Sequence, residues 1–303
     1  MVERSKKPGP IPVSSTEPES PGFVFKSDRV KLSLPTGESA EILLHGATVI
    51  SWVAGGGENL FLSEKAALDG SKPVRGGIPL VFPVFGKSTE GPTAALPQHG
   101  FARICKWELL GRTSETDTSI QVDFGLGPEN LTVEQRKQWP YDFGLIYSVN
   151  LSKSSLETKM LVRNEGSETF DFNFLFHTYL RIPDVNNLTI EGLKGTSYKC
   201  KVTKSEAVEE MVELSVGSEV DRVYANVPDT VQVKNGGEAI FKVDRTNLED
   251  VVVWNPWEGA SKMADFGPED GYKNMICIEA GAVSKWHTLE PQSVWEGSTI
   301  INL

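Results

Sequence analysis

The chain has 303 residues, of which 39% are hydrophobic and 23% are charged, and its formal net charge at pH 7 is −11. This composition is ordinary for a globular protein and excludes the disordered and membrane classes. The negative charge argues against a nucleic-acid-binding protein, because phosphate contacts supply most of that affinity.

The N-terminal residues 1–22 have no apolar run for a signal peptide and too many acids and prolines for a transit peptide. We expect a flexible tail there, followed by a single β-sandwich domain over residues 23–303. Cys105, Cys200 and Cys277 are isolated, with no spacing typical of zinc, a redox motif or a disulfide framework, which indicates a reduced compartment. No apolar stretch is long enough to span a bilayer. The predicted location is cytoplasmic, with no membrane or nucleic-acid partner.

Short apolar runs separated by turn residues predict mainly β-strands along the chain. The expected strands cover residues 30–34, 40–44, 48–53, 60–62, 143–151, 156–163, 170–182, 230–234, 239–243, 251–254, 275–280 and 298–303. Helix is scarce, and the best candidate covers residues 128–139 with Thr132 as its N-cap. The strands between residues 143 and 182 read as an antiparallel meander. We expect an all-β, mostly antiparallel fold with few short helices.

The most informative strand covers residues 170–182, with the sequence FDFNFLFHTYLRI. Alternate side chains of a strand point to opposite faces, so its phenylalanines form a core face and His177 lies on the other face. His177 has two interpretations. It is either a half-buried imidazole bonded to a neighbouring strand, or a proton donor directed into a cleft beside Tyr179 and Arg181. The stretch itself does not decide between them.

Two loops carry candidate ligand contacts. Residues 74–86 (VRGGIPLVFPVFG) place Arg75 before two glycines, which predicts either a loop packed on the core or a ligand-binding loop. Residues 96–103 (LPQHGFAR) place Gln98 and His99 in a turn and Arg103 shortly after it. An amide can bond hydroxyls in either direction and a guanidinium suits phosphate, while the alternative is a solvated turn.

Glu279 is a single carboxylate in the apolar segment MICIEAG, on the same strand face as Met275 and Cys277. Desolvation there would raise its pKa towards neutrality, which suits a general base. The alternative is a glutamate at a strand end that reaches solvent. Together with His177 and the arginines, it suggests acid–base chemistry on a hydroxylated anion. No metal-ligand spacing or nucleotide loop competes, so neither a metal nor a cofactor is predicted.

Six segments together resemble the hexose-6-phosphate mutarotase branch of the aldose 1-epimerase family, over roughly residue 22 to the C-terminus. They are RGGIPLVFPVFG, LPQHGFAR, FHTYLRI, EVDRVY, WNPW and ICIEAG. The resemblance implies a galactose-mutarotase-like β-supersandwich. It also implies that His177 is the general acid and Glu279 the general base, and that the substrate contacts are Arg75, Gln98, His99, Arg103 and Asp221.

The implied reaction interconverts the α and β anomers of hexose 6-phosphates, glucose 6-phosphate first, by ring opening and reclosure. It requires Glu279 ionised and His177 protonated in the resting enzyme, with the phosphate against Arg75 and Arg103. The expected partner is the small sugar phosphate alone, and the expected protein is a monomer. Two alternatives stay open: an epimerase for unphosphorylated aldoses and a noncatalytic sugar-phosphate-binding protein.

Overall fold

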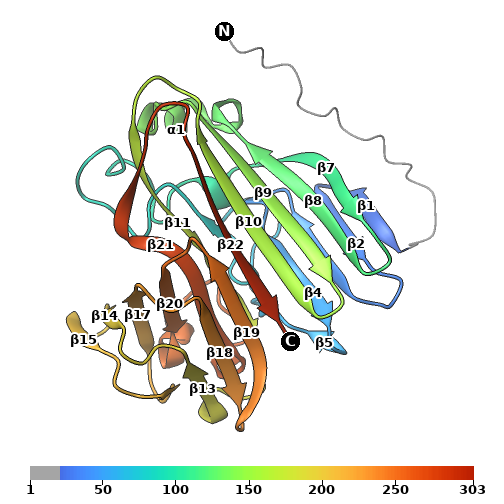
Figure 1. The fold of residues 1–303 in the computed structure, drawn as a ribbon, viewed down its shortest axis with the longest axis vertical. Helices are drawn as coiled ribbons and strands as arrows, with labels where there is room; N and C mark the ends of the chain where they lie inside the picture. Colours follow the sequence, from blue (N-terminus) through green and yellow to red (C-terminus); the bar gives the residue numbers. More distant parts are fainter. Residues whose placement is uncertain (1–20) are drawn as a thin grey trace.

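The computed structural model describes residues 21–303, and antiparallel sheets dominate this part of the chain (Figure 1). A five-stranded sheet comprises β1 (Gly22–Lys26), β2 (Arg29–Ser33), β3 (Ser39–Leu43), β4 (Val49–Ala54) and β5 (Gly57–Glu58). A nine-stranded sheet has, in spatial order, β16 (Glu213–Ser215), β13 (Leu188–Glu191), β18 (Thr230–Asn235), β19 (Glu238–Thr246), β22 (Val294–Asn302), β10 (Ser155–Asn164), β9 (Phe143–Ser152), β8 (Ser119–Leu126) and β7 (Glu108–Glu115).

An eight-stranded sheet lies behind the nine-stranded one. Its strands are β15 (Ser205–Val208), β14 (Ser197–Cys200), β17 (Val220–Ala225), β20 (Asp250–Asn255), β21 (Met275–Leu289), β11 (Phe170–Phe176) and β6 (Leu80–Val81), with β12 (Tyr179–Arg181) paired to β21 off this path. The helical segments are α1 (Val133–Gln138) and the 3-10 turns η1 (Ala102–Ile104), η2 (Pro128–Asn130), η3 (Val185–Asn187), η4 (Trp257–Lys262) and η5 (Gly271–Asn274). The all-β, mostly antiparallel prediction is confirmed.

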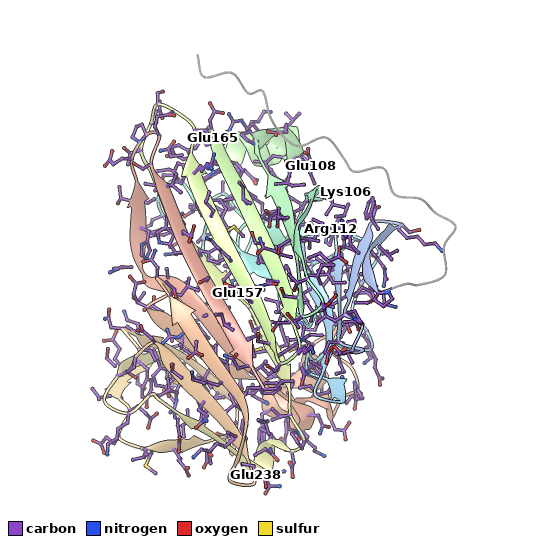
Figure 2. All side chains as sticks on the ribbon, turned by 45° about the vertical axis from the view of Figure 1, so that its right-hand side comes forward. Lys106, Glu108, Arg112, Glu157, Glu165 and Glu238 are labelled. Atoms are coloured by element: carbon purple, nitrogen blue, oxygen red, sulfur yellow. The ribbon has the colours of Figure 1, made fainter. Side chains whose placement is uncertain are left out.

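The main core lies between the two large sheets. Phe172, Phe174 and Phe176 of β11 point into it, as do Ile276 and Ile278 of β21, and all five are buried. The outer side of the nine-stranded sheet carries polar side chains such as Arg112 and Glu157 (Figure 2). Because side chains alternate along each strand, one face of each large sheet packs in the core and the other face can carry polar side chains or a binding site.

The strand predicted over residues 170–182 is interrupted. β11 ends at Phe176 and β12 begins at Tyr179, so His177 lies in a break between two strands. The predicted meander is confirmed for its first two strands, because β9 and β10 pair antiparallel. It is wrong for the third strand, because β10 pairs on its other side with β22, whereas β11 pairs with β21 and β6 in the other sheet. The turn after Asn164 moves the chain from one sheet to the other, which buries the phenylalanine face of β11 inside the sandwich.

Three smaller predictions have different outcomes. The predicted helix over residues 128–139 divides into η2 and α1, and Thr132 is the N-cap of α1, accepting a hydrogen bond from Gln135. The strand expected at residues 60–62 forms only isolated bridges. The predicted tail lies outside the described residues up to residue 20, while Gly22 already begins β1. None of the described helices is long and apolar enough to cross a membrane.

Candidate active site

The candidate site lies on the face of the eight-stranded sheet that points away from the main core. Along β21, Ile276 and Ile278 point into the core, so Cys277 and Glu279 point to the opposite face. His177 follows β11 directly, and both β11 and β12 pair with β21. The break between these two strands therefore places the imidazole beside Cys277 and Glu279.

Strand register aligns further side chains with this pair. Asp221 of β17 lies opposite Trp254 of β20, Trp254 lies opposite Cys277, and Cys277 lies opposite Tyr179 of β12. Neighbouring strands are about 4.8 Å apart, so this cross-strand row brings together residues that are distant in sequence. The row forms the floor of the site.

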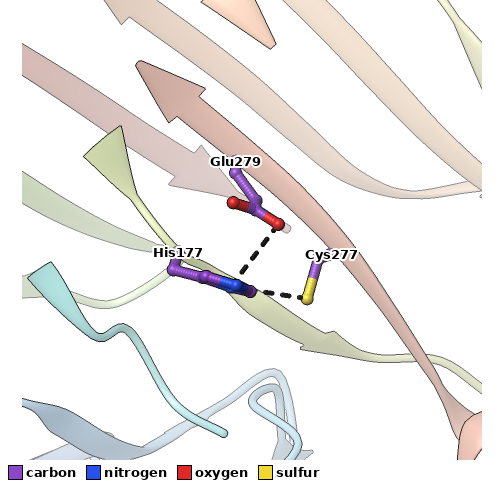
Figure 3. A group of neighbouring side chains, drawn as sticks. All are labelled: His177, Cys277 and Glu279. Atoms are coloured by element: carbon purple, nitrogen blue, oxygen red, sulfur yellow. Dashed lines mark hydrogen bonds and ion pairs between the residues drawn. The ribbon is translucent and has the colours of Figure 1, made fainter. Parts of the chain in front are cut away.

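His177 contacts both side chains of β21 (Figure 3). Its Nδ1 lies 3.5 Å from Glu279 Oε1 and 3.8 Å from Cys277 Sγ. All three residues are buried, with Glu279 only 1% exposed. The second carboxylate oxygen of Glu279, Oε2, is buried and has no hydrogen-bond partner. A buried carboxylate oxygen without a donor is available to a ligand.

Aromatic rings fix the plane of the imidazole. Tyr179 stacks on His177 with ring centroids 4.7 Å apart and an interplanar angle of 10°. Trp254 and His99 each meet it edge-on at 5.9 Å. These contacts orient His177 without adding a charge beside it.

The raised pKa of Glu279 agrees with the sequence-based expectation, whereas the expected charge states of the pair, an ionised Glu279 and a protonated His177, do not. Burial raises the pKa of Glu279 well above its usual range, opposed by the positive charges of Lys201 and Arg103 and aided by the negative charge of Asp221. Burial likewise lowers the pKa of His177 well below its usual range, and His99 and the nearby arginines add to this. The two groups therefore favour their neutral forms in the free protein, because desolvation outweighs their mutual attraction.

Arg75 enters the site from the loop before β6. Its Nε and Nη2 lie 3.2 Å from Asp265 Oδ2, and its Nη1 donates to the Tyr179 hydroxyl over 3.2 Å. Burial opposes its charge, but Tyr179 and Asp265 together raise its pKa. Gly77 has a φ of +66°, and a Cβ there would lie 2.1 Å from the carbonyl oxygen of Val49, so only glycine lets this loop approach so closely.

His99 comes from the second predicted loop and is held neutral. The backbone N–H of Gly86 donates to its Nδ1 over 3.2 Å, so the ring proton is on Nε2. Burial lowers its pKa to about 3, and the positive charges of Arg103, Lys201 and Arg75 contribute. Nε2 can therefore donate a hydrogen bond to a ligand; Gln98 Nε2 lies 3.4 Å from it.

Arg103 has spare hydrogen-bonding capacity. Its Nη2 donates to the Gln98 carbonyl over 2.8 Å, but its Nε is buried without a partner, and none of the ion pairs between described residues includes it. Burial lowers its pKa to about 10, so it stays cationic at neutral pH. A second cation, Lys201, lies 3.6 Å from Asp221 and 4.1 Å from the Phe85 ring centroid.

The structure thus gathers the predicted residues on one face. His177 contacts both Glu279 and His99, and Gln98 lies next to His99. Arg75 donates a hydrogen bond to Tyr179, which stacks on His177. Asp221 and Arg103 lie close enough to Glu279 to shift its pKa. Arg181 is an exception, because it turns away and donates to the Leu60 carbonyl.

Sequence reasoning missed Lys201, Asp265 and Trp254. Only Trp254 had a local signal, its place in the predicted strand that ends at the segment WNPW.

Comparisons with known proteins show the family of this chain. Residues 28–302 match the family model described as Aldose 1-epimerase. A Cenchrus ciliaris protein named "Putative glucose-6-phosphate 1-epimerase" is 37% identical over 269 residues, which are 85% of this chain and 79% of that protein. An Escherichia coli K12 protein with the same name is 29% identical over 251 residues, 81% of this chain and 80% of that protein.

Solved structures share the fold. The crystal structure of a "putative mutarotase" from Salmonella typhimurium superposes with a TM-score of 0.83 at 26% identity, covering 96% of each chain. A galactose 1-epimerase from Lactobacillus acidophilus superposes with a TM-score of 0.67 at 14% identity, covering 93% of this chain and 97% of that one. The predicted galactose-mutarotase-like sandwich is confirmed.

Proposed function

The chain belongs to the aldose 1-epimerase family, and from this premise we propose that it interconverts the α and β anomers of hexose 6-phosphates, glucose 6-phosphate first. The observation that carries the phosphate specificity is Arg103, a partly buried cation without a carboxylate partner among the described residues, close to the His177–Glu279 pair. A buried guanidinium of this kind is costly unless an anion pairs with it.

In the proposed reaction Glu279 takes the proton of the anomeric hydroxyl while His177 gives a proton to the ring oxygen. The bond between the anomeric carbon and the ring oxygen breaks, and a carbonyl forms at the anomeric carbon. The aldehyde end then rotates about the bond between the first two carbons. Reclosure on the other face returns both protons and releases the opposite anomer, so acid and base are regenerated without a cofactor.

The neutral pair and the working pair contain the same number of protons. Moving the shared proton from Glu279 Oε1 to His177 Nδ1, across the 3.5 Å contact, produces the carboxylate and imidazolium that the reaction needs. No proton has to come from solvent. We expect a bell-shaped pH profile for kcat/KM, because adding a proton to this pair or removing one abolishes the working state.

The two arginines take unequal roles in this proposal. Each nitrogen of Arg75 already contacts Asp265 or Tyr179, so its main role is to orient the tyrosine that stacks on His177. Arg103 keeps unused donors, and we assign it the larger share of phosphate binding. Its fork of N–H groups suits a phosphate by bidentate contact.

Proton NMR of the anomeric signals tests the proposal by following freshly dissolved α-glucose 6-phosphate and, separately, α-glucose. Wild type should accelerate relaxation of the phosphate ester over the uncatalysed rate, and Glu279→Gln should abolish the acceleration. Arg103→Gln should lower kcat/KM for the phosphate ester by roughly 30-fold or more, which corresponds to a lost desolvated charge pair of at least about 2 kcal/mol, while affecting glucose far less.

Arg112→Gln is the matched control, since Arg112 lies on the outer side of the nine-stranded sheet. Equal losses on both sugars in Arg103→Gln would contradict phosphate recognition and favour an epimerase for unphosphorylated aldoses. No acceleration of either sugar by wild type would favour a noncatalytic binding protein.

A further inference from the structure

Cys277 is a buried nucleophilic side chain that the proposed reaction does not use. It is fully buried on β21, two residues before Glu279 and on the same face, and its Sγ lies 3.8 Å from His177 Nδ1. Tyr179 and Trp254 flank it on the neighbouring strands. A thiol therefore lies directly beside the proposed acid–base pair, and any group that binds the thiol would also be close to His177 and Glu279.

The three side chains form a compact set of metal-donor atoms. One atom of each of His177, Cys277 and Glu279 lies within 4.8 Å of the others, and the two measured sides of this triangle are 3.5 Å and 3.8 Å. Zinc bonds to nitrogen, oxygen and sulfur at about 2.0 to 2.3 Å, so tetrahedral ligands lie roughly 3.3 to 3.7 Å from one another. Both distances from His177 are close to these values, and the distance between Cys277 and Glu279 is at most 4.8 Å, so only a small movement would complete the set.

We propose that His177, Cys277 and Glu279 bind Zn²⁺, or a divalent ion of similar softness, as a reversible inhibitor of this site. The ion would take imidazole nitrogen, thiolate sulfur and carboxylate oxygen as three ligands and a water as the fourth. Metal binding stands on the geometry alone. Inhibition rests on the proposed function, because the ion would occupy the nitrogen and carboxylate that the reaction needs.

Charge balance favours the ion despite the nearby cations. A thiolate and a carboxylate together neutralise Zn²⁺, so the bound site gains no net charge beside Arg75, Arg103 and Lys201. The ligand set also selects among ions. Mg²⁺ prefers six oxygen ligands and retains its water, whereas sulfur and imidazole prefer Zn²⁺ or Co²⁺. Magnesium should therefore not inhibit through this site.

Cobalt absorption provides a direct test that does not depend on activity. Adding Co²⁺ to the reduced full-length protein should produce a thiolate-to-cobalt charge-transfer band, and Zn²⁺ should displace it at stoichiometric concentration. The band should be lost in Cys277→Ser and the cobalt affinity should fall at least tenfold in Glu279→Gln. Cys200→Ser is the matched control, because Cys200 is also buried but lies in β14, outside the donor cluster, and it should retain the band.

Inhibition is measured separately as the Zn²⁺ concentration that halves the anomerisation rate, normalised to each variant's own metal-free rate. Removing a group that only orients a metal ligand typically weakens metal binding by roughly 10- to 100-fold. Removing a direct ligand should therefore raise the inhibitory Zn²⁺ concentration by at least this factor. Cys277→Ser should show this increase, Cys200→Ser should not, and EDTA should restore the rate. A cobalt band or zinc sensitivity unchanged in Cys277→Ser would overturn the proposal. A cobalt band in a protein without epimerase activity would refute the proposed function while leaving the metal site intact.

Discussion

At the scale of single residues, the burial of His99 should make the free energy of unfolding depend on pH. It is 8% exposed, and its Nδ1 accepts a hydrogen bond from the backbone of Gly86, so it cannot be protonated there without losing that bond. Its pKa of about 3 in the folded protein lies below the unfolded value of about 6.5. The unfolded chain therefore binds a proton between these values that the folded chain does not bind.

It follows that His99 destabilises the folded state progressively as the pH falls from about 6.5 towards 3, and has no such effect above 6.5. His99→Asn should remove this dependence while keeping an acceptor near Gly86. Urea unfolding of both proteins at pH 7, 6 and 5 would show the wild type losing up to about 1.4 kcal/mol per pH unit more than the variant. Parallel pH curves would contradict the assignment of His99 as a neutral buried base.

The sequence predicts some of these residues well and others not at all. The face that Glu279 occupies follows from strand alternation, because the apolar positions on either side of it point into the core. The alternation also predicted the face of His177, but not the break between β11 and β12 in which it lies. The raised pKa of Glu279 also follows from its apolar strand, but the lowered pKa of His177 does not, since its desolvation depends on loops packed above the sheet. Lys201 and Asp265 lie outside the regular strands, and no periodic pattern marks their side chains.

At the scale of elements, the loop between β6 and η1 depends on Gly100. Its φ is +70°, and a Cβ there would lie 2.1 Å from the Phe82 carbonyl oxygen. Gly91 has the same φ of +70° but has nothing within 4 Å of the corresponding Cβ position. Comparing alanine substitutions at Gly91 and Gly100 therefore distinguishes the free-energy cost of the backbone conformation from the cost of a steric clash.

Gly91→Ala should lower the free energy of unfolding by about 1 kcal/mol, the cost of a strained backbone alone. Gly100→Ala should lower it by at least roughly 2 kcal/mol more, because backbone atoms must move, and it should also reduce activity by displacing His99 and Arg103. Chemical unfolding and the anomerisation assay measure both effects. Similar losses in the two variants would mean that the close approach to Phe82 does not matter.

Hairpins were predictable from their turns, but the exchange of strands between sheets was not. The strands around residues 35–38 and 235–237 pair as expected, because the intervening residues allow tight turns. By contrast, the turn after Asn164 leads β11 into the other sheet. Local sequence specifies that a turn occurs, whereas the choice of partner depends on which sheet can bury the phenylalanine face.

At the scale of the whole molecule, one continuous core connects all three sheets. The main cluster includes Val30 of β2, Val122 of β8 and Ile276 of β21. Such a core should make the described residues unfold together, as the predicted single domain requires. Far-UV circular dichroism and tryptophan fluorescence should give coincident midpoints in urea. Two separated transitions would contradict the single-domain prediction.

The position of β22 has a consequence for synthesis on the ribosome. This strand lies between β19 and β10 in the nine-stranded sheet, although it follows both in the chain, and β21 directly before it supplies Glu279. Until β22 has emerged, the nascent chain exposes the unpaired edges of two long strands, which are sites for aggregation. The nine-stranded sheet can therefore be completed only after this last described strand has emerged, and Glu279, the proposed general base, emerges only shortly before it.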